Sequence, residues 1–123
     1  MFQTLSKTNQ KKFIEKYFDT VKGIGYTLGR VPIGSCDFSV DHDWTYDDTK
    51  NDVKLKHFDK KATRDKKTVI PLIKLAAKKI KHNKRKLKIL GSPWSAPAWM
   101  KTNDDLHTGG TLKKEHFSTM ATY

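Results

Sequence analysis

Two segments of this chain limit its possible folds more than any other feature. Residues 29–39 read GRVPIGSCDFS, and residues 90–103 read LGSPWSAPAWMKTN. Each begins as a short apolar stretch, which is typical of a buried strand, and ends in a turn with polar and aromatic side chains. We expect strands over 26–33 and 87–90. Pro32 should lie near the end of the first strand, because proline cannot donate a hydrogen bond to a neighbouring strand.

Helices are predicted on either side of the first strand. Residues 9–18 (NQKKFIEKYF) and 68–80 (TVIPLIKLAAKKI) each place apolar side chains on one helical face. The two faces consist of Phe13, Ile14, Tyr17 and Phe18, and of Ile70, Ile73, Ala76, Ala77 and Ile80. Phe117 and Met120 indicate the start of a third helix. Alternating helices and strands predict an α/β fold with parallel strands joined by right-handed crossovers.

The composition is strongly basic. Lys and Arg number 25 against 13 Asp and Glu, which gives a formal net charge of +12, and lysines crowd into residues 74–88. Such a balance favours nucleic acid or an anionic surface as a partner, although a run of lysines is more often only a solvated helix face. A small basic module that binds nucleic acid or an anionic membrane is therefore the alternative function, and it would bind in a salt-sensitive way.

Several other kinds of chemistry find little support in the sequence. The single Cys36 cannot form an internal disulfide, and we expect it to be a buried packing residue rather than a nucleophile. Residues 41–43 (DHD) lack further ligands nearby, so we expect no metal site. No apolar run is long enough to span a membrane, and the residues after Met1 do not read as a secretory leader. A secreted or lysosomal protein would carry its targeting segment upstream of this piece.

The ends of the two strands are the best candidate for a functional site. Ligands of parallel α/β folds gather where the strands end, which selects residues 35–38 and 92–95. Within them, Asp37 can accept hydrogen bonds from sugar hydroxyls, and Trp94 can pack its indole on the C–H face of a sugar ring. The same residue types also have structural uses, since an aspartate often caps a strand end and a tryptophan beside prolines often fills a core.

Four strings of residues together resemble the glucosylceramidases of glycoside hydrolase family 30. The family pattern contains RVP-x-x-SCDFS, Tyr-x-Asp-Thr, IPLI and SPW-S/T-x-P-x-W-x-KTN stretches. Here they fall at residues 30–39, 46–49, 70–73 and 92–103, and the resemblance covers roughly residues 10 to 123. It implies a partial (β/α)₈ TIM barrel, because a whole barrel needs roughly 250 residues and this chain has 123. We expect residues 1–123 to be a fragment, the N-terminal part of such a catalytic domain.

The resemblance also implies roles for single residues. Asp37 would hydrogen-bond glucose hydroxyls, and Trp94 would donate to the sugar through its indole N–H. Phe38 and Trp99 would shape the wall of the pocket. Arg30 would support the nucleophilic carboxylate electrostatically.

The family consists of retaining glycosidases, which need two carboxyl groups about 5 Å apart. In the family both groups are glutamates on later strands, and the acid/base follows an asparagine. The glutamates of this chain are Glu15 and Glu115, which follow Ile14 and Lys114. We therefore expect no catalytic residue in this chain and no activity of the chain alone.

The resemblance further implies what the parent enzyme does. It would hydrolyse the β-glucosidic bond of glucosylceramide to glucose and ceramide with retention, as a step of sphingolipid metabolism. It would work in the lysosomal lumen in association with the membrane, with an activator protein and an anionic membrane surface as partners. The resemblance implies no nucleic acid, no metal and no cofactor.

Overall fold

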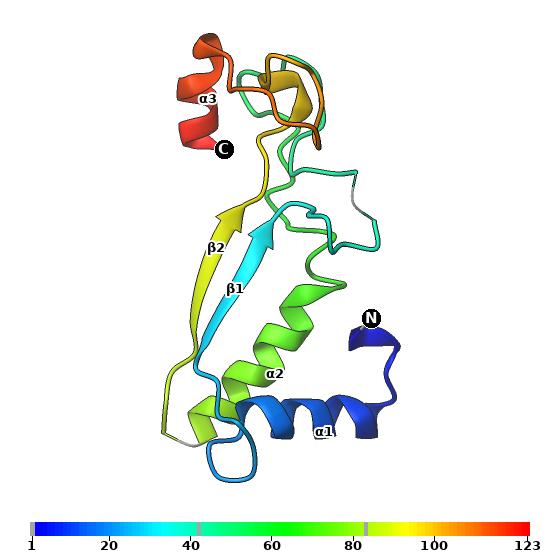
Figure 1. Ribbon diagram of the computed structural model, residues 1–123, viewed down its shortest axis with the longest axis vertical. Coiled ribbons are helices and arrows are strands. Elements are labelled where there is room, and N and C mark those ends of the chain that lie inside the picture. The colour runs from blue at the N-terminus through cyan, green and yellow to red at the C-terminus, as the bar shows by residue number, and fades with distance from the viewer. Residues whose placement is uncertain (1, 42, 83) are drawn as a thin grey trace. The chain divides into compact units, whose positions relative to one another are not determined.

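The computed structural model describes residues 2–41, 43–82 and 84–123 (Figure 1). Its helices and strands are α1 (Lys7–Phe18), β1 (Leu28–Ile33), α2 (Val69–His82), β2 (Lys88–Pro93) and α3 (Phe117–Thr122). Single turns of 3₁₀ helix lie at η1 (Phe2–Thr4), η2 (Ala98–Met100) and η3 (Lys114–His116). This order confirms the predicted alternation of helices and strands.

The two strands are parallel neighbours in one sheet, and the connection between them runs through α2 (Figure 1). The predicted α/β class with parallel strands is therefore confirmed. Pro32 is the last residue but one of β1, as expected from its missing N–H. β2 continues past the predicted end at Leu90 to Pro93, although Gly91 and Pro93 are poor strand formers.

Capping explains where the first helix begins. α1 starts at Lys7 rather than at the predicted Asn9, because the Ser6 hydroxyl accepts a hydrogen bond from the Asn9 N–H at 3.2 Å. Among the described residues, no helix combines the length and the apolar character that crossing a membrane requires.

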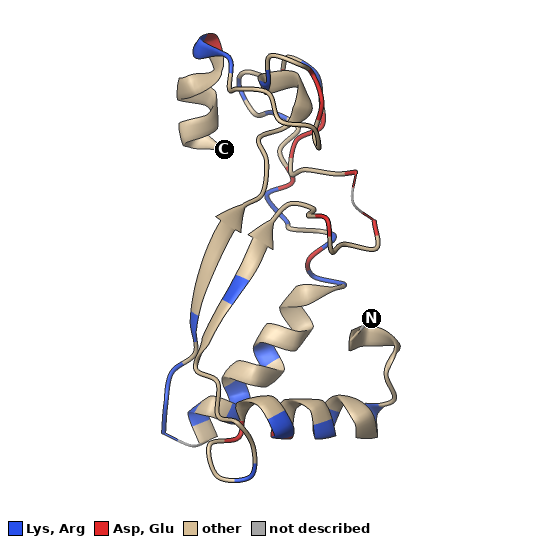
Figure 2. Ribbon diagram, in the orientation of Figure 1, with Lys and Arg blue, Asp and Glu red and all other residues tan. Residues whose placement is uncertain are grey.

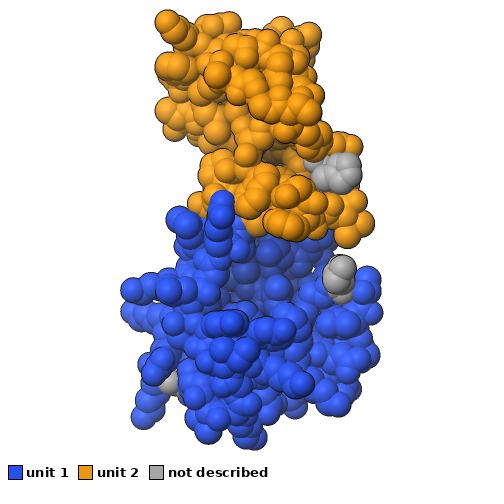
Figure 3. All heavy atoms as spheres, viewed as in Figure 1, with its two compact units in different colours: residues 1–31, 62–90 blue, residues 32–61, 91–123 orange. Residues whose placement is uncertain are grey.

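The chain divides into two compact units (Figure 3). Unit 1 contains residues 1–31 and 62–90, and unit 2 contains residues 32–61 and 91–123. In unit 1, α1 packs on α2, and the buried apolar side chains are Ile14, Ala76 and Ile80. These three belong to the helical faces that the apolar periodicity predicts.

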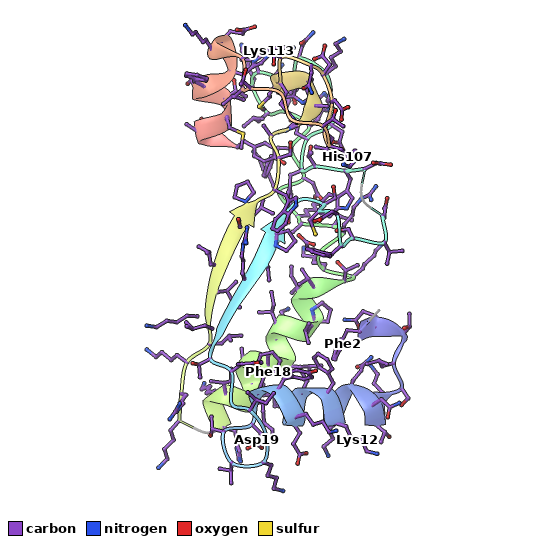
Figure 4. All side chains as sticks on the ribbon, in the orientation of Figure 1. Phe2, Lys12, Phe18, Asp19, His107 and Lys113 are labelled. Carbon is purple, nitrogen blue, oxygen red and sulfur yellow. The ribbon has the colours of Figure 1, made fainter. Side chains whose placement is uncertain are left out.

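The turn after α1 ties this helix to α2. The Asp19 carboxylate (Asp19 is labelled in Figure 4) accepts hydrogen bonds from the N–H groups of Val21 and Lys22 at 2.8 and 3.1 Å. It also pairs with the Lys79 ammonium at 2.7 Å. The hydrogen bond from Lys79, followed by the two backbone N–H groups, holds the pKa of Asp19 well below its ordinary value. Gly23 is required in this turn, because a Cβ atom there would lie 2.2 Å from the Glu15 carbonyl oxygen.

Unit 2 is built mostly from loops around a small apolar core. Leu55, Trp99 and Met100 are buried in this core, and Phe58, Ala96, Leu112, Met120 and Tyr123 pack against them. The Tyr123 hydroxyl accepts a hydrogen bond from the Tyr46 N–H at 2.8 Å, which fastens the end of the chain to the long polar segment that follows β1. The described residues of this segment as far as Lys61 therefore belong to unit 2, even though they lack regular secondary structure.

Candidate functional site

A pocket in unit 2 collects the residues that follow the two strands. Ser35, Cys36 and Asp37 line it after β1, and Trp94, Ser95 and Ala96 line it after β2. Lys101, Leu106, His107, Gly109, Gly110 and Leu112 complete its lining. Its volume of about 590 Å³ lies within the range of small-molecule sites, roughly 300 to 1,000 Å³. Asp37 and Trp94, the residues selected from the sequence, thus line the same pocket.

The loop after β1 is held by its own serine side chains. Ser35 is buried, its hydroxyl donates to the Trp44 carbonyl at 2.7 Å, and its backbone N–H donates to the same oxygen at 3.1 Å. The Ser39 hydroxyl accepts from the Cys36 N–H at 3.1 Å, which closes a short turn around Asp37. Cys36 itself is buried, as expected for a packing residue. These bonds leave the side chain of Asp37 exposed at the tip of the turn.

Trp94 lines the pocket, whereas Phe38 lies beside its indole and is not among the lining residues. The ring of Phe38 meets Trp94 edge-on, with ring centroids 6.4 Å apart and an interplanar angle of 71°. Phe38 is 83% exposed and Trp94 is 42% exposed, so both rings keep free surface. An exposed indole beside a carboxylate is suited to a sugar, because the ring covers C–H groups while the carboxylate accepts from hydroxyls.

Trp99 lies in the core of unit 2 rather than in this pocket. It is 5% exposed, and its indole N–H donates to the Asp47 carbonyl at 2.9 Å. His116 packs edge-on against it at a centroid distance of 5.0 Å. The position of Trp99 fits support of the loops that carry the pocket.

Arg30 lies within β1, in unit 1. Its side chain is exposed, and it lines a shallow groove of that unit together with Leu28, Gly29 and residues 88–90. The electrostatic role expected for Arg30 stays a prediction.

Lys101 is a residue of the pocket that the sequence reasoning missed. It is 6% exposed, and its ammonium donates to the Ser95 hydroxyl at 3.2 Å and to the Leu106 carbonyl at 3.4 Å. The residue stands in the KTN part of the string at residues 92–103, which is the signal that could have drawn attention to it. An ammonium has three N–H donors, and these two partners are neutral. Lys101 therefore adds a positively charged hydrogen-bond donor to the pocket lining.

His107 was also missed, since it lies in a loop without periodicity. Its Nε2 atom is 2.6 Å from the Asp43 carboxylate (His107 is labelled in Figure 4). The contact joins the segment after β1 to the loop after η2. Asp105 shapes that loop by accepting from the Thr108 hydroxyl and from the N–H groups of His107 and Thr108. These hydrogen bonds, that of the Thr108 hydroxyl first, lower the pKa of Asp105 to about 2.

The weak metal motif at residues 41–43 includes His42, which lies outside the described residues. Within the described ranges, no group of three or more His, Cys, Asp or Glu side chains is arranged to hold a metal ion. Glu15 lies on α1 and Glu115 in η3, and neither lines the pocket that contains Asp37.

Comparison with known proteins relates this arrangement to one family of enzymes. Residues 1–122 match the glycosyl hydrolase family 30 TIM-barrel domain. The chain is 42% identical over 109 residues to the lysosomal acid glucosylceramidase of Mus musculus, an alignment that covers 89% of this chain and 20% of that protein. It is 39% identical over 104 residues to an endo-1,6-β-D-glucanase of Aspergillus fumigatus, with coverage of 83% and 20%.

Solved structures agree with these matches. SrfJ from Salmonella typhimurium superposes with a TM-score of 0.82 at 35% sequence identity, over 99% of this chain and 26% of that one. The chain spans about a fifth of the length of the curated relatives that it matches. Its fold is therefore part of a TIM barrel, and by sequence and structure alike the chain belongs to glycosyl hydrolase family 30.

Proposed function

We propose that this chain supplies the glucose-binding end of a retaining β-glucosidase that hydrolyses glucosylceramide to glucose and ceramide. The observation that carries the proposal is the shared pocket of Asp37 and Trp94, with the ring of Phe38 beside the indole. The carboxylate would accept hydrogen bonds from glucose hydroxyls, and the indole would cover the C–H face of the ring. Trp99 would support the pocket wall from the core, and Arg30 would support the nucleophile.

Two relatives with different names favour glucose as the recognised group. One is named as a glucosylceramidase and the other as an endo-1,6-β-D-glucanase, so both names specify a glucose unit, and the second name specifies a β-linkage. Identity is higher to the glucosylceramidase, 42% against 39%, which favours the glycolipid as the substrate. By the same likeness we propose that the whole protein works in the lysosome, at a membrane that contains the glycolipid.

The catalytic carboxyl pair is proposed to lie outside these 123 residues. A retaining glycosidase holds its two carboxyl groups about 5 Å apart on either side of the scissile bond. Glu15 is a helix residue of unit 1, and Glu115 belongs to η3 in unit 2. Asp37 is then a binding residue, since none of the other described residues that line its pocket carries a carboxyl group.

A chimera tests the binding role. Residues 1–122 of this chain would replace the matching segment of the mouse enzyme, and hydrolysis of glucosylceramide and of β-1,6-glucan would be measured. We expect hydrolysis of the glycolipid, and we expect Asp37→Asn to lower kcat/KM about 100-fold because a charged hydrogen-bond acceptor is lost. Asp41→Asn, the same change in the same loop but outside the pocket lining, should leave kcat/KM within about twofold. Equal activity of the two variants would refute the role of Asp37.

The isolated chain provides a second test. We expect the purified 123 residues to release no fluorophore from a fluorogenic β-glucoside, because the carboxyl pair is missing. Fluorophore release that increases with protein concentration, and that the Asp37→Asn variant lacks, would show instead that this chain carries its own catalytic groups.

A further inference from the structure

Positive charge is divided unevenly between the two units. Most of the 25 Lys and Arg residues lie in unit 1, whose acidic residues are Glu15, Asp19 and Asp65. Figure 2 shows lysines and arginines along α1, along α2 and in the connection that leads to β2. Since the pocket with Asp37 and Trp94 belongs to unit 2, glucose recognition gives no reason for this charge.

One groove of unit 1 combines this charge with apolar surface. It lies between α1 and α2 and has a volume of about 470 Å³. Leu75 provides most of its apolar side-chain surface, because Leu75 is 40% exposed whereas Ile14, which also lines it, is 6% exposed. Lys7, Lys11 and Lys78 lie along its rim, and Gln10, Glu15, Lys79 and His82 complete the lining.

The rim lysines keep their charge unneutralised. Lys79 pairs with Asp19 at 2.7 Å, whereas Lys7, Lys11 and Lys78 form no ion pair with any described residue. Glu15 is the single acidic residue of the lining, so positive charge exceeds negative charge around the groove. Like charges held near one another repel, and an anion placed among them relieves that repulsion.

We propose that the groove between α1 and α2 binds a single-chain anionic amphiphile. The alkyl chain would lie on Leu75 and on the methylene stems of the lining lysines. A carboxylate or phosphate head would lie among the ammonium groups of Lys7, Lys11 and Lys78. The volume lies in the range of small-molecule sites. Nucleic acid fits less well, because its bases bind by stacking on aromatic rings and the lining contains no Phe, Tyr or Trp. This inference does not depend on the proposed glucosidase function.

The test distinguishes the contribution of the anionic head group to binding from that of the alkyl chain of the ligand. The 123-residue protein, labelled with ¹⁵N, would be titrated with dodecanoate below its micelle concentration, with dodecyl maltoside, and with acetate. We expect saturable amide shifts in residues 7–15 and 75–82 with dodecanoate, and much smaller ones with the neutral-headed chain or with the head alone. Saturation with dodecyl maltoside at the same concentration, or shifts confined to unit 2, would overturn the proposal.

Variants distinguish a site from general attraction. We expect Lys11→Glu with Lys78→Glu to weaken dodecanoate binding about tenfold, because two attractions become repulsions. Lys54→Glu with Lys60→Glu changes the net charge equally at exposed positions of unit 2 and should change binding less than about twofold. Equal weakening by both pairs would mean that net charge alone attracts the probe. Binding to anionic vesicles without binding of monomeric dodecanoate would point to a membrane surface and would also overturn the proposal.

Discussion

At the scale of single residues, Ser35 fastens the loop after β1 through several buried hydrogen bonds to Trp44. Its hydroxyl donates to the Trp44 carbonyl and also accepts from the Trp44 N–H at 3.3 Å. We expect Ser35→Ala to lower the free energy of unfolding by about 1 to 2 kcal/mol, because both side-chain bonds are buried. Urea titration measures this loss. Ser118→Ala, at an exposed position of α3, is the matched control and should have little effect.

The buried carboxyl group of Asp47 should make folding stability depend on pH in the opposite direction from most carboxylates, whose pKa is lowered by folding. Burial, and then the nearby charge of Asp52, raise the pKa of Asp47 above its ordinary value. The folded state therefore holds a proton that the unfolded chain has already released, so stability falls as the pH rises from the ordinary pKa through the raised one. The Thr49 N–H donates to one oxygen of this carboxyl group at 3.1 Å.

Asp47→Asn tests this sign. The amide keeps an acceptor for the Thr49 N–H and carries no charge at any pH. We expect the variant to gain stability relative to the parent at pH 7, and the gain to shrink at pH 3, where Asp47 is already neutral. Urea midpoints at both pH values measure the difference. A gain of equal size at the two pH values would contradict the raised pKa.

The sequence identified single site residues correctly where a side chain suited to binding also followed a predicted strand. Asp37 and Trp94 both follow strands, so a rule about strand ends was enough to bring them to one pocket. Lys101 and His107 could not be found in this way, because their contacts with Leu106 and Asp43 arise inside loops that have no periodicity. Trp99 carried no sign in the sequence that it would be buried, since a tryptophan can form a pocket wall or fill a core.

At the scale of elements, the turn after α1 leaves no room for a side chain at Gly23. We expect Gly23→Ala to destabilise the fold by about 1 to 3 kcal/mol, because the added Cβ would lie 2.2 and 2.4 Å from the backbone oxygens of Glu15 and Lys16. Gly109 has a positive φ of 63° but open space around a Cβ. Gly109→Ala should therefore cost only about 1 kcal/mol of backbone strain. Thermal unfolding of the two variants compares them, and a larger loss for Gly109→Ala would contradict the steric argument.

Element boundaries show what local sequence can and cannot predict. α1 and α2 were predicted because apolar side chains repeat on one face, and Ile14, Ala76 and Ile80 are indeed buried. The end of β2 was missed because pairing with β1 extends it through residues of low strand propensity as far as Pro93.

At the scale of the whole chain, the net charge of +12 predicts a response to salt. Like charges repel one another in the compact state, and salt screens that repulsion. We expect the urea midpoint to rise between 20 and 300 mM sodium chloride. The pairs Asp19–Lys79 and Asp104–Lys113 would weaken under the same screening, so a fall in the midpoint would mean that specific ion pairs outweigh the general repulsion.

The exposure of the three tryptophans gives the chain a built-in optical reporter. Trp44 and Trp99 are 9% and 5% exposed, whereas Trp94 is 42% exposed and borders the pocket. Acrylamide should therefore quench the emission of Trp94 before that of the other two. Under the proposed function, a sugar seated against this indole would shield it, and a fall in quenching on addition of glucose would report that binding without an attached dye.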